Sequence, residues 1–237
     1  MTAFIGTAGW SLPREAQSHF PALGTHLERY AARFPAVEIN SSFYRPHRPE
    51  TYARWAASVP ATFRFCVKLP RTITHDARLV QAGPLLDDFL PGPAALGATF
   101  GCLLVQLPPS LGYDADVTED FLGELCARYD GPIAIEPRHA SWFDADVDAL
   151  LTAWQVARVA ADPARVPEAA IPGGWPGMVY FRLHGSPRMY YSAYDDAYLD
   201  RVAAQLGEAP ADAWCIFDNT TLGAATENAL GVLERTQ

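Results

Sequence analysis

The sequence has very little lysine: Lys68 is the only one, although the chain has 18 basic residues. All the others are arginines, a bias that genome composition can explain without reference to function. A single surviving lysine indicates a position where arginine would not serve, because an ammonium is compact and can lose its proton when it is desolvated, whereas a guanidinium cannot. The alternative is that Lys68 remained by chance, and the sequence does not decide between the two.

Cysteine is also scarce, and its spacing fits neither a metal site nor a disulfide framework. The four cysteines are Cys66, Cys102, Cys126 and Cys215; no two of them have CxxC spacing, and no histidine lies at zinc-finger spacing. The chain shows no secretory leader and no run of about 18 apolar residues. We therefore expect reduced thiols, no membrane span and a cytoplasmic location.

Positive charge is in the minority, with 27 acidic against 18 basic residues and a formal net charge of −9. An acidic surface repels phosphate backbones and anionic lipids at long range, which disfavours nucleic acid or a membrane as a partner of the whole molecule. Hydrophobic residues make up 49% of the chain, enough for a core, and this excludes a disordered protein.

Short apolar runs alternate with amphipathic helical patterns along the whole chain. The runs predict strands at 3–6, 36–40, 63–68, 101–106, 132–136, 156–161, 178–184 and 213–218. Helical patterns lie at 27–34, 49–58, 84–96, 117–129, 145–154, 195–206 and 222–235. The connection 162–177 is rich in proline and glycine, so the helix after strand six is expected to be missing or replaced by a loop.

Strands that alternate with helices predict an α/β fold with a parallel sheet. Eight strands in 237 residues fit a (β/α)8 TIM barrel better than an open sheet, and we expect residues 1–237 to form one such domain. The turn after the first strand, Gly6-Thr7-Ala8-Gly9-Trp10, is not a dinucleotide-binding glycine motif, and no Walker motif occurs. No cofactor is evident from the sequence.

Polar residues close seven of the eight predicted strands. Side chains alternate along a strand, and barrel sites lie at the carboxyl ends of strands, so these residues predict a ligand site at one mouth of the barrel. They are Glu38, Asn40, Lys68, Gln106, Glu136, Asp162, Arg182, His184, Asp218 and Asn219. The alternative is a self-neutralising lattice, in which Glu38, Glu136 and Asp162 pair with Lys68, Arg182 and His184.

The loops after these strands carry aromatic and cationic residues that suit the wall of a small-molecule pocket. These residues are Tyr44, Arg45, Arg138, His139, Trp142, Tyr190 and Tyr191. For His139 and Trp142 a capping loop is an equal alternative, and Tyr190 also suits burial under its own loop. His75 stands beside Asp76 and could serve as a general base, but a role in capping a helix or turn is the favoured interpretation.

A series of short motifs recurs in order over nearly the whole chain. They are GTAGWS (6–11), VEINSSFYR (37–45), FCVKLPRTITH (65–75), VQLPP (105–109), IEPRHASW (135–142), RLHG (182–185) and FDN (217–219) with Asn228. This series resembles the YecE-like family, catalogued as domain of unknown function 72. The resemblance implies a TIM barrel similar in shape to metal-dependent sugar isomerases and endonuclease barrels, without an established activity.

The chain departs from the family pattern at two places. Residues 12–15 read Leu-Pro-Arg-Glu and lead to His19-Phe20-Pro21, where the family has a Trp and a Phe-Tyr-Pro, so the first loop is atypical. Asp218 replaces the first of two asparagines, which adds a negative charge near the predicted site.

The leading hypothesis is a small-molecule enzyme with acid–base chemistry of the isomerase, lyase or hydrolase type. Lys68 and Glu136 are the predicted catalytic residues, because burial and neighbouring charges can tune the pKa of both. Arg138, Arg182 and His184 are predicted to bind an anionic group, and the amides and tyrosines to orient hydroxyls, so the expected substrate is a polar anionic or sugar-like molecule. Hydrolysis by Glu38 and Glu136, or a Schiff base at Lys68, fits the same residues.

Two alternatives stay open. The first is a metal-dependent barrel, in which Glu38, Glu136, Asp218 and His184 would suit Mg²⁺ or Mn²⁺ better than zinc, although we assign no metal ligand. The second is a non-catalytic module that binds a ligand or a nucleic-acid end through locally converging cations. Those cations are Arg45, His47, Arg48, Lys68, Arg138, Arg182 and Arg188.

Overall fold

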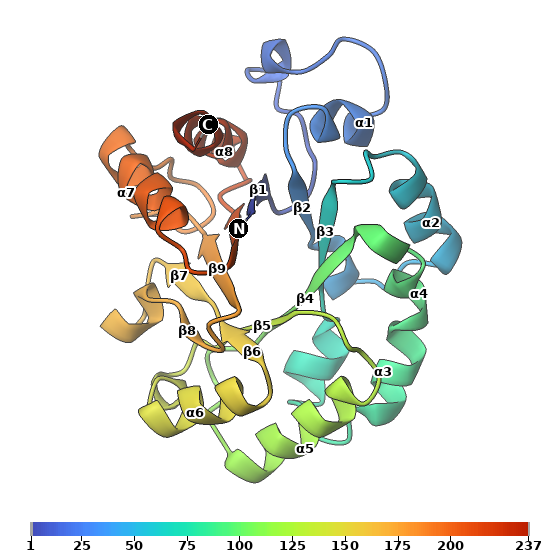
Figure 1. Cartoon of the computed structure of the whole chain (residues 1–237), viewed down its shortest axis with the longest axis vertical. Helices are drawn as coiled ribbons and strands as arrows, with labels where there is room; N and C mark the ends of the chain where they lie inside the picture. The colour runs from blue at the N-terminus through green and yellow to red at the C-terminus, as the bar shows by residue number, and fades with distance from the viewer. Residues whose placement is uncertain (1, 237) are drawn as a thin grey trace.

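In the computed structural model, which describes residues 2–236, strands and helices alternate along the chain and the helices surround the strands (Figure 1). The strands are β1 (Ala3–Thr7), β2 (Ala36–Ile39), β3 (Arg64–Lys68), β4 (Phe100–Gln106), β5 (Ile133–Glu136), β6 (Val156–Arg158), β7 (Ala160–Asp162), β8 (Gly173–Gly174), β9 (Met178–Leu183) and β10 (Asp212–Phe217). Every predicted strand has a counterpart here, and the predicted run 156–161 is divided into β6 and β7.

The strands form two sheets. One sheet has the order β1-β10-β9-β7 and the other the order β2-β3-β4-β5-β6-β8. The pairs are parallel, apart from the short β8, which is antiparallel to β6. A mixed α/β fold with parallel strands is therefore confirmed, but the expectation of one continuous closed sheet is not met.

The two sheets adjoin at two seams, where backbone pairing between neighbouring strands is interrupted, and each seam has a local cause. Between β1 and β2, the hydroxyl of Tyr30 accepts from the backbone N–H of Thr7 at 2.8 Å and donates to the carbonyl of Ala36 at 3.1 Å. This side chain takes the place of backbone pairing, and one bridge, between Ala8 and Glu38, joins the sheets there. The other seam lies between β6 and β7, where the chain leaves its pairing with β5 and joins β9.

Eight α-helices lie among the described residues: α1 (His26–Ala31), α2 (Pro49–Ala57), α3 (Gly83–Phe89), α4 (Pro91–Ala94), α5 (Ala115–Cys126), α6 (Ala145–Ala153), α7 (Asp196–Gly207) and α8 (Ala224–Arg235). The connection after β7 contains the 3-10 turn Pro167–Ala170 and β8 instead of an α-helix, as the sequence predicts. None of the helices in residues 2–236 is long and apolar enough to cross a membrane.

The alternation of side chains along the strands separates two layers of the core. Residues such as Val37, Val67 and Ile135 pack in the larger cluster with the helices. Residues of the opposite parity, such as Cys66 and Tyr180, form a smaller inner cluster with their counterparts on neighbouring strands. Because alternation continues to the strand ends, the inner face changes from apolar to polar at the carboxyl ends of the strands.

Candidate functional site

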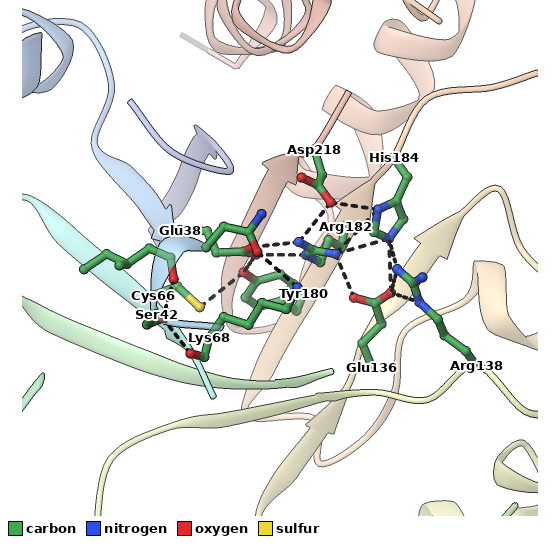
Figure 2. Close-up of polar contacts among 12 residues, drawn as sticks. Glu38, Ser42, Cys66, Lys68, Glu136, Arg138, Tyr180, Arg182, His184 and Asp218 are labelled. Carbon is green, nitrogen blue, oxygen red and sulfur yellow. Dashed lines mark hydrogen bonds and ion pairs between the residues drawn. The ribbon is translucent and has the colours of Figure 1, made fainter. Parts of the chain in front are cut away.

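Arg182, on β9, is fully buried and pairs with three carboxylates (Figure 2). Its Nε and Nη2 donate to the two oxygens of Glu38 at 2.9 and 2.7 Å. Its Nη1 donates to Oε2 of Glu136 at 3.2 Å, and Nη2 also lies 3.0 Å from Oδ2 of Asp218. The acids come from β2, β5 and the end of β10, so one guanidinium joins the carboxyl ends of four strands.

His184 follows β9, and both of its ring nitrogens face carboxylates. Nδ1 lies 3.1 Å from Oδ2 of Asp218, and Nε2 lies 3.1 Å from Oε1 of Glu136. Two arginines also lie close to this ring: Nη2 of Arg138 is 3.3 Å and Nη1 of Arg182 is 3.4 Å from Nε2 of His184. Arg138 donates from Nε to the same oxygen of Glu136 at 2.9 Å. Arg138 and Arg182 therefore offset part of the negative charge of the three acids.

The charges around Glu136 keep its carboxyl ionised. Burial pulls the pKa of Glu136 upward, but Arg138, Arg182 and His184 outweigh burial and hold this pKa well below its usual value. A carboxylate whose ionised form is this strongly favoured is a weak base. The geometry therefore supports a role for Glu136 in holding charged groups in place more than a role in carrying protons.

The stability of the protein in acid should depend on Glu136. Because its folded-state pKa lies below the ordinary value of 4.5, the stabilisation is complete above that pH and is lost as the pH falls below it. We expect the free energy of unfolding to drop as the pH falls below about 4.5, and to drop less steeply in Glu136→Gln. Urea unfolding between about pH 3 and 7 measures this slope. The exposed Glu15→Gln serves as the control, and equal slopes in all three proteins would contradict the prediction.

Lys68 ends β3 on the same inner face, but it is not paired with an acid. Its side chain is buried, with 5% of the residue exposed, and within residues 2–236 no carboxylate oxygen lies within 4.0 Å of Nζ. Nζ donates to Oδ1 of Asn40 at 3.0 Å and lies 4.1 Å from the centre of the Phe43 ring. An amide oxygen and an aromatic face are weaker partners for an ammonium than a carboxylate.

The surroundings of Lys68 make its amine easy to deprotonate. Burial first, and then the charge of Arg182, lower the pKa of Lys68 to about 8, against an opposing effect of the nearby acids. At neutral to weakly alkaline pH a part of the population therefore holds a neutral amine, which is both a base and a nucleophile.

Ser42 fixes the backbone on which Lys68 stands. Its hydroxyl lies 2.8 Å from the carbonyl oxygen of Ile39 and 2.7 Å from that of Lys68, and so connects the ends of β2 and β3 (Figure 2). Ser42 belongs to the 3-10 turn Ser41–Phe43, which also carries the aromatic ring beside the amine. One turn thus positions both the strand end and the ring.

His75 lies at this mouth too, although the sequence favoured a capping role for it. It belongs to a π-helical turn after β3 and packs edge-on against Phe43, with 4.9 Å between ring centres. Partial burial, and then the charges of Lys68, Arg71 and Arg138, lower the pKa of His75. Asp76 acts in the opposite direction, but burial and the three cations together outweigh it. In the sequence, the only indication that His75 lies at this mouth was its position in the first turn after the polar end of a predicted strand.

Other predicted site residues lie near the charged cluster. Gln106 is buried at the end of β4 and makes no side-chain hydrogen bond with the described residues. The amide nitrogen of Asn219 donates to the carbonyl of Ser192 and to Oδ1 of Asn228, both at 2.9 Å. The ring of Tyr190 packs edge-on against His184, with 5.7 Å between ring centres.

The remaining predicted residues lie apart from the cluster. Trp142 is buried and donates from Nε1 to the carbonyl of Leu111 at 2.9 Å, because a buried indole N–H needs an acceptor, so it holds a loop instead of lining the mouth. His139 is exposed and caps its turn by accepting from the backbone of Ser141. The other three are on the surface side: Tyr44 is 74% exposed, Arg45 is exposed, and Tyr191 packs against Arg188.

The pairing within the cluster differs from the predicted lattice at two residues. Among residues 2–236 no cation pairs with Asp162; its Oδ1 accepts from the hydroxyl of Tyr194 at 2.8 Å. Lys68, the predicted partner of an acid, has no ion pair among residues 2–236. Asp218, at the position where the family pattern has asparagine, supplies the third carboxylate instead.

The acids around Arg182 do not fit a divalent cation. The guanidinium lies between Glu38, Glu136 and Asp218 and bonds to oxygens of all three. A Mg²⁺ ion, which prefers about six oxygen ligands, would have to displace this guanidinium. In the described part of the chain, no group of three His, Cys, Asp or Glu residues is arranged to hold a metal ion.

Comparison of the sequence with known families and proteins gives a clear result. A model of the family described as "Protein of unknown function DUF72" matches residues 4–237. The UPF0759 protein YecE of Escherichia coli K12 is 34% identical over 142 residues, which are 59% of this chain and 50% of that protein. The UPF0759 protein YunF of Bacillus subtilis is 28% identical over 151 residues, 59% of this chain and 52% of the relative. The chain spans about half the length of the curated relatives it matches.

Solved structures with a similar fold come from the same family. A DUF72 family protein of Enterococcus faecalis superposes with a TM-score of 0.82 at 23% identity, covering 99% of this chain and 95% of that one. One from Thermotoga maritima gives a TM-score of 0.80 at 22% identity, covering 99% and 98% of the two chains. At such identities the likeness concerns the fold alone.

Proposed function

Because this chain belongs to the DUF72 family of proteins of unknown function, we propose its activity from its own residues: it is a small-molecule enzyme in which the amine of Lys68 performs acid–base chemistry. The observation that carries the proposal is the burial of this amine without a carboxylate partner among residues 2–236. Burying an unpaired charge costs free energy, and a group retained at such a cost is a candidate for function.

The ion pairs of the cluster support this choice of residue. Arg138 and Arg182 lie among three carboxylates, and each of these cations contacts at least one of them. Lys68 lies beside this group, and its amine contacts none of the carboxylates among residues 2–236. The paired residues therefore serve as a rigid support, and Lys68 is the group that is free to gain or lose a proton.

The substrate class follows from the charge and polarity of the mouth. Besides partial burial, the charges of Lys68 and Arg138 lower the pKa of His75, which supports a mouth suited to an anionic group. Gln106 and Asn40 supply amide groups that can orient hydroxyls. A polar anionic or sugar-like molecule, changed by isomerase-, lyase- or hydrolase-type chemistry, fits these residues. Arg138 and Arg182 are both paired with carboxylates, so the direct contact with the anion is assigned to Lys68.

We also propose a setting for the site. The order of strands in the two sheets and the bridge between Ala8 and Glu38 support two halves of one barrel formed by residues 1–237, with the site at its carboxyl-end mouth. Cys66, Cys102 and Cys215 are buried free thiols, which supports a reducing, cytoplasmic location.

A thermal-shift screen tests the proposed function. The probes are sugar phosphates, sugar acids and small 2-oxo acids, each at a concentration well above a micromolar Kd. A compound that binds only the folded state at 100 times its Kd adds about 2.7 kcal/mol, which raises the Tm of a chain of this size by roughly 5–10 °C. We expect such a rise in the wild type and its loss in Lys68→Met.

The matched control for this screen is Arg71→Met, which removes an exposed cation from the same loop region. This variant should keep most of the response, because Arg71 is already paired with Asp76. If no probe shifts the Tm, or if Lys68→Met responds as the wild type does, the proposed site is wrong.

A further inference from the structure

We propose that Lys68 acts as a nucleophile and forms a Schiff base with an aldehyde or ketone group of the substrate. This inference rests on the proposed function, because it assigns a carbonyl compound to the same site. It goes further in one respect, since it makes the bond between enzyme and substrate covalent.

The contacts of Lys68 suit a nucleophile better than a structural cation. A lysine paired with a carboxylate is held in its protonated form, which has no lone pair to attack a carbonyl carbon. Here Nζ has one amide oxygen as its hydrogen-bond acceptor among residues 2–236, Oδ1 of Asn40, and rests against the face of Phe43. Burial and the charge of Arg182 lower the pKa of this amine to about 8, so the neutral form is available near neutral pH.

The support around the amine suits a covalent intermediate. The side chain projects from the end of β3, whose backbone is tied to the end of β2 through Ser42. A rigid base limits the movement of Nζ, and a reacting group held in place lowers the entropic part of the barrier. The neighbouring acids favour the cationic form of Lys68, and a protonated imine carries the same single positive charge as that ammonium.

The chemistry balances without an oxidant, a reductant or a metal. The lone pair of neutral Nζ attacks the carbonyl carbon, the C=O electrons move to oxygen, and a proton moves from nitrogen to that oxygen to give a carbinolamine. The hydroxyl leaves as water, with one proton from solvent or a side chain, and a protonated imine remains. This imine withdraws electrons from the adjacent C–H or C–C bond, which is the activation that isomerases and lyases need. His75 packs edge-on against the same Phe43 ring that contacts the amine.

Because the chain has a single lysine, an adduct on a lysine can be assigned to Lys68 directly. The purified chain of 237 residues is incubated with glyceraldehyde 3-phosphate or with glyoxylate in the presence of sodium cyanoborohydride, which reduces an imine to a stable secondary amine. Mass spectrometry of the intact protein and of its peptides then locates the adduct. Besides Lys68, the α-amine of the chain is the one amine that can react, and its ordinary pKa of about 8 matches that of Lys68.

Because the two amines have similar pKa values, the α-amine is an internal control for the effect of basicity on the rate of modification. If the site binds carbonyl compounds, Lys68 should be modified at least about tenfold faster than the α-amine, since binding supplies proximity that basicity does not. In Lys68→Arg the α-amine adduct should be the only adduct that forms, provided that the Tm of the variant equals that of the wild type. Modification of the two amines at equal rates would overturn the inference.

The outcomes separate the inference from the proposed function. If a carbonyl probe raises the Tm of the wild type but not of Lys68→Met, and no adduct forms on Lys68, the Schiff base is wrong and Lys68 acts as a base. If neither a Tm shift nor an adduct appears, the proposed function fails as well. An adduct on Lys68 in preference to the α-amine supports both.

Discussion

Replacing Arg182 with methionine should lower the free energy of unfolding at pH 7 by about 3–5 kcal/mol, because removal of one partner leaves buried charges uncompensated. The variant would leave the fully buried Glu38 and Glu136, and the nearly buried Asp218, without their shared guanidinium. Domains of this kind have a total stability of about 5–15 kcal/mol, so the loss is a large share of the whole. Urea unfolding followed by tryptophan fluorescence measures it.

Two controls show whether the loss comes from the ion pairs. Arg33→Met removes an exposed arginine and should change the stability by less than about 0.5 kcal/mol. Adding Glu38→Gln to Arg182→Met removes one of the carboxylates that has lost its cation. The loss in the free energy of unfolding should therefore be smaller in the double variant than the sum of the losses in the two single variants. An Arg182→Met protein as stable as Arg33→Met would show that the cluster contributes little to folding.

The polar strand ends were predictable because alternation along a strand is a local property. Glu38, Lys68, Glu136 and Arg182 each stand two residues from a small or apolar residue that faces inward, such as Cys66 before Lys68. Parity therefore placed them on one face without knowledge of the fold. The helix-free connection after strand six was equally readable, because proline and glycine act on their own backbone.

The partners within the cluster were not predictable, because they depend on side chains from distant strands. Arg182 and Glu38 are separated by 144 positions in the chain and form two hydrogen bonds. The sequence offered Asp162 as a counter-charge, but a tyrosine hydroxyl occupies its Oδ1, and Asp218 takes that place. Which acid meets which base depends on the three-dimensional positions of strands that are far apart in the sequence, and a residue pattern does not contain these positions.

For a similar reason, the sequence did not predict that the sheet is interrupted. The pattern predicts strands, but it does not show that the hydroxyl of Tyr30 stands between Thr7 and Ala36. A Cβ added at Gly6 would lie 2.1 Å from the carbonyl oxygen of Ala36, so the glycine permits the close approach of the two strands at this seam. Such a substitution of a side chain for backbone pairing appears only in three dimensions.

The contribution of Lys68 to stability should depend on alkaline pH and, like that of Glu136 in acid, it should increase as the pH rises. In the folded protein its pKa is about 8, against an ordinary value of 10.5, so between these values the unfolded chain binds more protons than the folded one. Stability rises with pH wherever the unfolded state binds more protons. Relative to Lys68→Met, which has no charge at this position, the wild type should therefore gain up to about 3 kcal/mol between pH 7 and pH 10.5.

The comparison of wild type with Lys68→Met isolates this effect, because tyrosines and cysteines titrate in both proteins and cancel in the difference. Chemical unfolding of the pair at about pH 7, 8.5 and 10 is sufficient. At pH 7 the methionine variant should be at least as stable as the wild type, since it avoids burying an ammonium without a carboxylate partner. A difference that stays constant with pH would mean that the folded protein does not weaken proton binding at Lys68. The amine would then be an ordinary cation, and the case for a nucleophile at this position would fall with it.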